Sequence, residues 1–278
     1  MKKVYITDLD HTLLRSDLSI SDFTKDVWNQ KADNAFVSIA TARSFYSAST
    51  LLGGFTLNAP LILLDGSLIV SSEKKIIDTK FLDYDSANEL INEAIKFSDL
   101  HPFVIGLKDK DLNETFDFPL QQTHIQKELL KNFKDDPRLK QFKRLHASKQ
   151  TFKIVYMGSY EQMKPLSEHL KAMFAHVFEF KLSPENYTEG YFLTILHPLG
   201  DKGHGLQKLS EHLNRPLEDI TVFGDSINDI GMFRLAGTSV AVSNALDEAK
   251  AVANIILEHS NDDDGVAHYL QNKVATYL

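Results

Sequence analysis

The stretch VYITDLDHTLL, Val4 to Leu14, is the part of the sequence from which the fold can best be predicted. Its first four residues are apolar or β-prone, as is typical of a strand buried on both faces of a parallel sheet. The run ends in two carboxylates, Asp8 and Asp10, and the hydroxyl of Thr12 follows closely. In open α/β sheets, ligands bind beyond the carboxyl ends of the strands, so chemistry is expected at these acids. A strand followed by an ordinary polar turn explains the stretch equally well, so the interpretation depends on matching segments downstream.

Two further apolar segments repeat this arrangement along the chain. Ala35 to Ala40 ends at Thr41-Ala42-Arg43-Ser44, and Pro60 to Leu64 ends at Asp65-Gly66-Ser67. Between the first two strands, the spacing of apolar side chains predicts a helix over Ser21 to Gln30. Strands that alternate with helices favour βαβ units and a parallel sheet, so the three polar loops are expected to converge on one edge.

The pattern changes in the middle of the chain. From Asp83 to about Leu196, helices and strands are mixed and no strand ends in acids, and Ser86 with Glu89 predicts a capping box before a helix. We interpret this stretch as an inserted α+β domain. The predicted fold class is therefore α/β, with a Rossmann-like parallel-sheet core at 1–82 and 197–278 and the insert at 83–196.

A second acidic pair follows another buried segment near the end of the chain. Ile220 to Phe223 is apolar, and Asp225 and Asp229 come soon after it. Four clustered carboxylates would repel strongly, since two unit charges about 4 Å apart cost about 4 kcal/mol at an effective dielectric near 20. A divalent ion would relieve this repulsion, and oxygen ligands favour a hard cation such as Mg²⁺. Lys202 adds one positive charge, which is not enough to neutralise four carboxylates.

The composition limits the classes of protein to consider. The 278 residues carry a net charge of −8, with 43% hydrophobic and 24% charged residues, an ordinary globular balance that disfavours nucleic acid as a partner. The chain has no cysteine, which excludes disulfides and thiolate metal sites and fits a reducing cytoplasm. The N-terminal apolar run is too short for a signal peptide or a membrane span, so we expect a cytoplasmic protein without membrane contact. A monomer is the default expectation, because the sequence does not fix the oligomeric state.

Together these segments favour phosphoryl transfer, in which catalysis consists mostly of positioning and charge neutralisation. A carboxylate can attack phosphorus and form an aspartyl-phosphate. A second acid can protonate the leaving oxygen and later activate water. Thr41, Lys202 and the backbone N–H groups of the first loop are candidates for binding the phosphoryl oxygens.

The ordered set of motifs resembles the haloacid dehalogenase superfamily and, within it, the Cof-type phosphatases. The resemblance spans both ends of the chain, whereas the middle matches only in position and in its mixed α/β character. Each motif is short, but the whole set in this order is specific. The matching segments are Asp8-Leu9-Asp10-His11-Thr12-Leu13-Leu14, Thr41-Ala42-Arg43, Asp65-Gly66-Ser67, Lys202-Gly203, Gly224-Asp225-Ser226-Ile227-Asn228-Asp229-Ile230-Gly231-Met232, Ala236-Gly237, Val240-Ala241-Val242-Ser243-Asn244-Ala245 and Asn261-Asp262-Asp263-Asp264-Gly265-Val266-Ala267.

The resemblance implies a role for each matching residue. Asp8 would be the nucleophile and Asp10 the general acid and base. Mg²⁺ would be held by Asp8, Asp225 and the backbone carbonyl of Asp10, with Asp229 in support. The expected site residues are Asp8, Asp10, Thr41 and Lys202 for catalysis, Thr41, Ala42, Arg43, Gly66, Lys202 and Asn228 for substrate or phosphate binding, and Asp8, Asp10, Asp225 and Asp229 for the metal.

Three positions depart from the family pattern. His11 and Ala42 each stand where glycine is usual, and Asp65 stands where asparagine is usual. These changes leave the reaction class intact and leave the substrate preference open. For Arg43, substrate binding and an ordinary salt bridge are equally compatible with the sequence.

We therefore expect a Mg²⁺-dependent phosphatase for small phosphorylated metabolites such as sugar phosphates, with the insert as a cap that closes over substrate. A phosphomutase or phosphotransferase of the same superfamily is the nearest alternative, because it would pass the phosphoryl group to a second hydroxyl. A catalytically silent, metabolite-binding regulator is the alternative from another class. The presence of Asp8, Asp10, Lys202 and Asp225 together argues against it.

Overall fold

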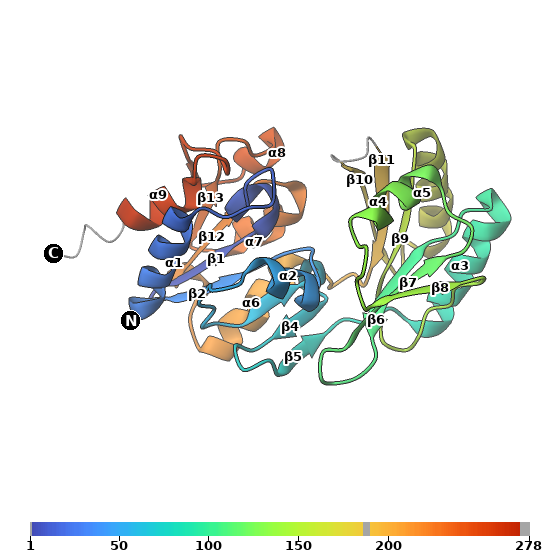
Figure 1. Cartoon of the computed structure of the whole chain (residues 1–278), viewed down its shortest axis with the longest axis horizontal. Helices are drawn as coiled ribbons and strands as arrows, with labels where there is room; N and C mark the ends of the chain where they lie inside the picture. Colours follow the sequence, from blue (N-terminus) through green and yellow to red (C-terminus); the bar gives the residue numbers. More distant parts are fainter. Residues whose placement is uncertain (1, 186–189, 273–278) are drawn as a thin grey trace. The chain divides into compact units, whose positions relative to one another are not determined.

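The computed structural model describes residues 2–185 and 190–272, which form two compact units (Figure 1). One unit contains the chain up to Thr79 and from Gly200 onward, and the other is Lys80–Leu199. The second unit is therefore an insertion in the sequence of the first. No helix among the described residues is long and apolar enough to cross a membrane.

The first unit is built on a five-stranded parallel sheet with the order β14-β13-β12-β1-β2. Its strands are β1 (Val4–Thr7), β2 (Phe36–Ile39), β12 (Ile220–Gly224), β13 (Thr238–Ala241) and β14 (Ile255–Ile256). All residues of β1 and β12 are buried, as expected for inner strands of a sheet covered on both faces. The predicted α/β class with a parallel-sheet core is confirmed.

Helices continue the alternation around this sheet. They are α1 (Asp22–Asn34), α2 (Phe45–Leu51), α6 (Lys202–Leu213), α7 (Ile230–Leu235), α8 (Asp247–Lys250) and α9 (Gly265–Asn272). Helix α1 packs against α9, and α6 packs against α7 (Figure 1). Ser21 caps α1 by accepting a hydrogen bond from the backbone N–H of Thr24, and the helix runs beyond its predicted end at Gln30.

The third predicted strand, Pro60 to Leu64, joins the parallel sheet through a single described bridge, between Ala40 and Ile62. This strand, β3 (Leu61–Leu63), otherwise forms a small antiparallel sheet with β4 (Leu68–Val70) and β5 (Ile76–Thr79). The loop after β3 still lies against the loop after β2, because the N–H of Asp65 donates to the carbonyl of Thr41 at 3.0 Å. The predicted meeting of polar loops therefore holds at this point.

The second unit contains a six-stranded sheet with the order β10-β11-β9-β6-β7-β8, antiparallel except between β7 and β8. Its elements are α3 (Tyr84–Ser98), β6 (Phe103–Leu107), β7 (Glu114–Pro119), α4 (His124–Lys131), β8 (Leu139–Phe142), β9 (Thr151–Gly158), α5 (Tyr160–Phe174), β10 (Glu179–Glu185) and β11 (Gly190–Leu196). The sequence gives no clear apolar pattern for β7 or β8, because β7 mixes acids with aromatics and β8 is mostly exposed.

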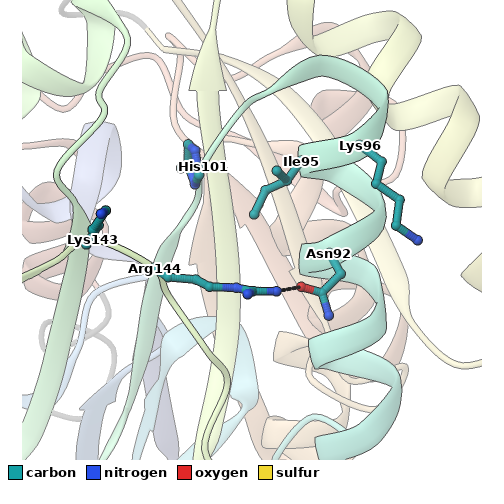
Figure 2. A pocket seen from close by; sticks show the side chains of 6 residues that line it. All are labelled: Asn92, Ile95, Lys96, His101, Lys143 and Arg144. Carbon is teal, nitrogen blue, oxygen red and sulfur yellow. Dashed lines mark hydrogen bonds between the residues drawn. The ribbon is translucent and has the colours of Figure 1, made fainter.

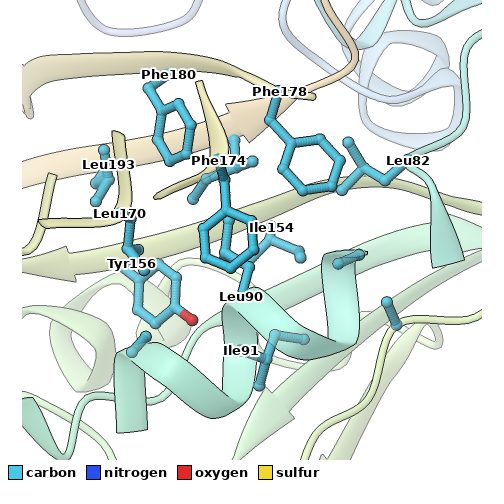
Figure 3. Packing of buried hydrophobic residues seen from close by; sticks show 14 of the residues in the cluster. Leu82, Leu90, Ile91, Ile154, Tyr156, Leu170, Phe174, Phe178, Phe180 and Leu193 are labelled. Atoms are coloured by element: carbon cyan, nitrogen blue, oxygen red, sulfur yellow. The ribbon is translucent and has the colours of Figure 1, made fainter. Parts of the chain in front are cut away.

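Each face of this sheet packs its own core. Along β9, Ile154 and Tyr156 belong to the cluster formed with α3 and α5 (Figure 3), whereas Val155 and Met157 belong to a separate cluster with Phe103. This split follows from the alternation of side chains along a strand. Both faces are therefore covered by apolar side chains.

The start of α3 differs from the prediction. Asp83 is the N-cap, and its side chain accepts a hydrogen bond from the N–H of Ser86 at 2.9 Å. The predicted capping box of Ser86 with Glu89 is wrong, because an acceptor three residues earlier already satisfies the first turn.

Candidate active site

Asp8 lies at the carboxyl end of β1. Its backbone N–H donates to the carbonyl of Phe223 at 2.9 Å, so β1 and β12 end side by side. The chain then turns through a short helical segment, η1 (Leu9–Leu13). Asp8 is only 6% exposed. A buried carboxylate is costly without a partner, so its neighbours decide whether it can stay charged.

Lys202 is the positively charged partner of this carboxylate. Its side chain is fully buried, and Nζ lies 2.8 Å from Oδ1 of Asp8 and 2.6 Å from Oδ1 of Asp229. Lys202 is the first residue of α6, whose N-terminus is capped by Asp201 through two backbone N–H groups of the first turn. The cap fixes where the helix begins, so the ammonium group is held between the two acids.

The turn after β12 brings the second acidic pair to the same place. Oδ1 of Asp225 accepts a hydrogen bond from Oγ1 of Thr12 at 2.9 Å, which ties this turn to η1. Oδ2 of Asp229 accepts the backbone N–H groups of Asp225 and Ser226 at 2.9 and 3.0 Å, so this carboxylate braces its own turn. Carboxylate oxygens of Asp8, Asp225 and Asp229 lie within 4.8 Å of one another.

Burial dominates the electrostatics of this cluster. Burial raises the pKa of Asp8 well above its ordinary value; Lys202 opposes the shift, and Asp229 and Asp225 add to it. Burial is the main cause that raises the pKa of Asp225 to about 6, and repulsion from Asp229 raises it further. The hydrogen bond from Thr12 acts in the opposite direction and lowers this pKa. For Lys202, burial lowers the pKa, but attraction to Asp229 and Asp8 outweighs burial, and the net shift is upward.

The donor set fits a hard divalent cation. Three carboxylates face one ammonium group in a buried place, and the pKa values of Asp8 and Asp225 are raised first by burial and then by repulsion between the carboxylates. Carboxylate oxygens are the ligands that Mg²⁺ prefers. Asp8 and Asp225 are better placed as direct ligands than Asp229, because both oxygens of Asp229 already bind Lys202 or backbone N–H groups.

Asp10 has a different partner. Nε and Nη2 of Arg43 lie 2.8 and 2.5 Å from its two carboxylate oxygens, which makes a bidentate ion pair. Nη1 of Arg43 also donates to Oγ of Ser47 at 3.2 Å. The sequence left substrate binding and a salt bridge open for Arg43. The structure shows the salt bridge, and its partner is Asp10, a predicted catalytic residue.

Thr41 follows β2, the neighbour of β1, and is fully buried. Its N–H donates to the carbonyl of Ile62 at 2.9 Å, and its Oγ1 accepts the N–H of Arg43 at 3.1 Å. A hydroxyl that accepts one hydrogen bond still has its own proton to donate. Thr41 can therefore donate to a further acceptor, while Ala42, beside it, is half-buried.

The loop after β3 reaches the turn after β12 with an unusual backbone. Leu64, Asp65 and Gly66 all have positive φ, of 50°, 60° and 102°. Asp65 accepts a hydrogen bond from Nδ2 of Asn228 at 3.1 Å. Gly66 lies so close to the carbonyl of Asp201 that a Cβ atom would clash with it. Only glycine fits this position, which gives Gly66 a backbone role in bringing the loop against the start of α6.

The family departure at His11 has a structural consequence in η1. Its φ is 56°, in the left-handed region that glycine adopts freely and other residues adopt at a cost. The carbonyl of His11 accepts Nδ2 of Asn244 at 2.8 Å. Asn261 in turn donates its N–H to Oδ1 of Asn244 at 2.9 Å and its Nδ2 to the carbonyl of Leu14 at 3.0 Å. These contacts hold the loop that carries Asp10.

All of the predicted site residues lie in the first unit. Three residues without a predicted role connect the motifs in the structure: Thr12, Asn244 and Asn261. The available signal was their place inside the matching motifs, since polar side chains next to reacting groups commonly support them. Nδ2 of Asn228 donates a hydrogen bond to Asp65, a pairing that the sequence did not predict.

Known proteins resemble this chain over nearly its whole length. Residues 5–270 match a family described as haloacid dehalogenase-like hydrolase. A 5-amino-6-(5-phospho-D-ribitylamino)uracil phosphatase from Bacillus subtilis (strain 168) is 26% identical, over 96% of this chain and 96% of that protein. An HMP-PP phosphatase from Serratia proteamaculans (strain 568) is 26% identical, over 98% of this chain and 95% of that protein. A crystal structure of a protein from Thermotoga maritima superposes with a TM-score of 0.80 at 25% identity. The match covers 98% of this chain and 97% of that protein's chain.

Proposed function

Because this chain belongs to the haloacid dehalogenase-like hydrolase family, we propose that it is a Mg²⁺-dependent phosphatase acting through an aspartyl-phosphate. Its substrates are small phosphorylated metabolites such as sugar phosphates. Two relatives named as phosphatases of small organic phosphates support this substrate class. The observation that carries the proposal is the buried cluster in which Lys202 contacts Asp8 and Asp229, with Asp225 beside them.

Asp8 is the nucleophile in this proposal. One carboxylate oxygen attacks the phosphorus of the substrate, and the bond from phosphorus to the ester oxygen breaks. Lys202, 2.8 Å from Oδ1 of Asp8, favours the charged carboxylate and can neutralise phosphoryl oxygens. The hydroxyl of Thr41, the side chain of Asn228 and the N–H groups of η1 are further donors to those oxygens. The backbone of Ala42, Arg43 and Gly66 supports the same subsite.

Asp10 is the general acid and base. It protonates the leaving oxygen and then takes a proton from the water that attacks the aspartyl-phosphate, which releases phosphate and restores Asp8. Both oxygens of Asp10 accept N–H groups of Arg43 in the structure. One of them must be released by Arg43 before Asp10 can offer a proton to the leaving oxygen.

The metal of the proposal is held by Asp8, Asp225 and the backbone carbonyl of Asp10, with Asp229 in support. When bound, Mg²⁺ supplies positive charge to the phosphoryl oxygens and to the clustered carboxylates. The role of the second unit as a cap over the substrate, the cytoplasmic location and the monomeric state stay predictions from the sequence.

Phosphate release from a panel of sugar phosphates, nucleotides and cofactor phosphates tests the proposal. We expect Mg²⁺-dependent release from at least one class, and none by Asp8→Asn, which keeps the side-chain shape and removes the nucleophilic charge. Mass spectrometry of protein quenched in acid during turnover should show a phosphate adduct on Asp8. Full activity of Asp8→Asn would refute the nucleophile assignment.

The same panel separates the alternatives. A phosphomutase or phosphotransferase would release little phosphate and would convert one phosphate ester into another. A silent metabolite-binding regulator would bind members of the panel and convert none of them. No contact in the described part of the chain favours either alternative over hydrolysis.

A further inference from the structure

The second unit contains a cavity, and none of its lining residues has a role in the proposed reaction. Its volume is about 750 Å³, within the range of roughly 300–1,000 Å³ that is typical of small-molecule sites. Helix α3 supplies part of the lining, and the rest comes from the segment before β6 and the segment after β8. The lining residues are Asn92, Ile95, Lys96, His101, Lys143 and Arg144 (Figure 2).

The lining carries positive charge that carboxylates of the described residues neutralise only in part: Nε2 of His101 lies 3.8 Å from Oδ1 of Asp99, which is an ion pair only when the imidazole is protonated. The lining itself contains no acidic residue. Within residues 2–185 and 190–272, neither Lys143 nor Arg144 has a carboxylate partner. Lys96 lies 3.4 Å from Glu93, but its side chain is 73% exposed, so this pair is weak. In a protein with a net charge of −8, this local excess of positive charge favours an anion.

Arg144 has a neutral hydrogen-bond partner that leaves its charge in place. Its Nη2 donates to Oδ1 of Asn92 at 2.9 Å, and Figure 2 shows the side chain extended toward that amide. Asn92 is neutral, so the contact orients the guanidinium and leaves its other N–H donors for a ligand. Asn92 and Lys96 are four residues apart on α3 and therefore share one face of the helix. The Arg144 side chain is exposed, so a ligand can reach it, and a planar guanidinium suits the oxygens of a phosphate group.

The other walls of the cavity are apolar or fixed. Ile95 is partly buried and packs against the core cluster of the unit. The carbonyl of His101 accepts Nε2 of Gln126 at 2.8 Å, and the imidazole is 12% exposed. An apolar wall beside a cationic one is complementary to a ligand that has both an anionic group and a carbon skeleton.

We propose that this cavity binds a small organic phosphate, with Arg144 and Lys143 contacting the phosphate group and Ile95 contacting the organic part. Every lining residue belongs to the second unit, whereas every predicted catalytic residue belongs to the first. The inference does not depend on the proposed phosphatase activity. Free phosphate shares the anionic chemistry, so the test must separate it from an organic phosphate.

Binding of phenylphosphonate, which has no hydrolysable ester, and of inorganic phosphate to the full chain tests the proposal. Titrations would follow the side-chain amide of Asn92 by NMR, in wild-type protein and in Asp8→Asn. We expect phenylphosphonate to shift this signal equally in both, and to bind more tightly than inorganic phosphate. Equal affinity for the two anions would overturn the role of the apolar wall.

Two double variants complete the test. K143Q with R144Q removes the two lining cations that have no carboxylate partner among the described residues. K149Q with K171Q removes two exposed lysines of the same unit that do not line the cavity. We expect the first to weaken phenylphosphonate binding at least tenfold and the second to leave it unchanged. No shift of the Asn92 amide at millimolar ligand, or equal loss in both variants, would overturn the proposal.

Discussion

Oγ1 of Thr12 donates a hydrogen bond to Oδ1 of Asp225 at 2.9 Å, across 213 residues of chain. The contact is possible because β1 and β12 are parallel neighbours, with Thr7 paired to Phe223 at their carboxyl ends. The loop after one strand therefore supports the acid after the other. A hydroxyl that follows the first acidic pair thus helps to decide the charge state of the second.

Thr12→Val should weaken Mg²⁺ binding at mildly acidic pH. The hydrogen bond from Thr12 opposes the upward shift that burial and Asp229 impose on the pKa of Asp225. Without it, that pKa rises above about 6, and protons compete more effectively with the cation. We expect affinity for Mg²⁺ at pH 6 to fall about tenfold, which corresponds to the loss of one hydrogen bond to a charged group. Calorimetry measures this, and Thr12→Ser should bind as the wild type does.

Lys202→Ala should lower kcat by about 10²–10³, the usual effect of losing one donor that stabilises transition-state charge. Removal of the ammonium group also leaves Asp8 and Asp229 buried without their partner, so the free energy of unfolding should fall by about 3–5 kcal/mol. Steady-state rates at saturating substrate, measured well below the unfolding transition, separate the two effects. A decrease in kcat below tenfold would count against a catalytic role.

Asp225→Asn should stabilise the metal-free protein and remove its response to Mg²⁺. The folded pKa of Asp225 is raised to about 6, so the folded state binds a proton that the unfolded state releases near pH 4. This group therefore costs stability increasingly as pH rises from about 4 to about 6. In EDTA at pH 7, we expect the Tm of Asp225→Asn to be about 2–4 °C higher than that of the wild type. Wild-type protein should gain Tm on addition of Mg²⁺, and a similar gain in Asp225→Asn would argue against the ligand role.

Much of the core could be predicted because its signals are local. Buried apolar runs such as Val4–Thr7 mark inner strands, and the acids at their ends mark one edge of the sheet. Membership of the haloacid dehalogenase family is confirmed by the match over residues 5–270. The acids at the strand ends are therefore expected to lie near one another, and near Lys202. The distances between Asp8, Lys202 and Asp225 could not be predicted in this way.

Contacts that depend on three-dimensional register could not be predicted. Arg43 pairs with Asp10, and Asp65 pairs with Asn228, because loops from different strands meet at angles that no single segment encodes. The edge strand β8 escaped prediction for a related reason. Its residues are mostly exposed, so pairing with β7, and not an apolar pattern, makes it a strand.

Tyr156→Phe should keep or increase the stability of the protein. The hydroxyl of Tyr156 is buried in the core between the sheet of the second unit and its helices (Figure 3), and it has no hydrogen-bond partner among the described residues. An unsatisfied buried hydroxyl costs about 1–3 kcal/mol, which phenylalanine avoids at nearly equal volume. Urea unfolding measures the difference. Tyr156→Leu is the control and should destabilise by leaving a cavity, whereas a marked loss in Tyr156→Phe would reveal a hydrogen bond to that hydroxyl.

Asp264→Asn should destabilise the first unit, and the effect should vanish in acid. Burial alone would raise the pKa of Asp264, but hydrogen bonds from Arg15, Ser21 and Thr24, at 2.8, 2.8 and 3.0 Å, outweigh burial and lower it. A carboxyl with a lowered folded pKa stabilises the protein above its unfolded pKa, near 4, and loses that contribution as pH falls through the folded value.

At pH 7 we expect Asp264→Asn to lower the free energy of unfolding by about 1.5–3 kcal/mol, the range for hydrogen bonds to a charged group. The neighbouring Asp263→Asn is the matched control. Asp263 is exposed, and among the residues that the structure describes its side chain accepts a hydrogen bond only from nearby Ser260. Urea unfolding at pH 7 and at successively lower pH should show the difference between the two variants shrinking below pH about 4. A difference that is independent of pH would mean that the charge of Asp264 contributes nothing to stability.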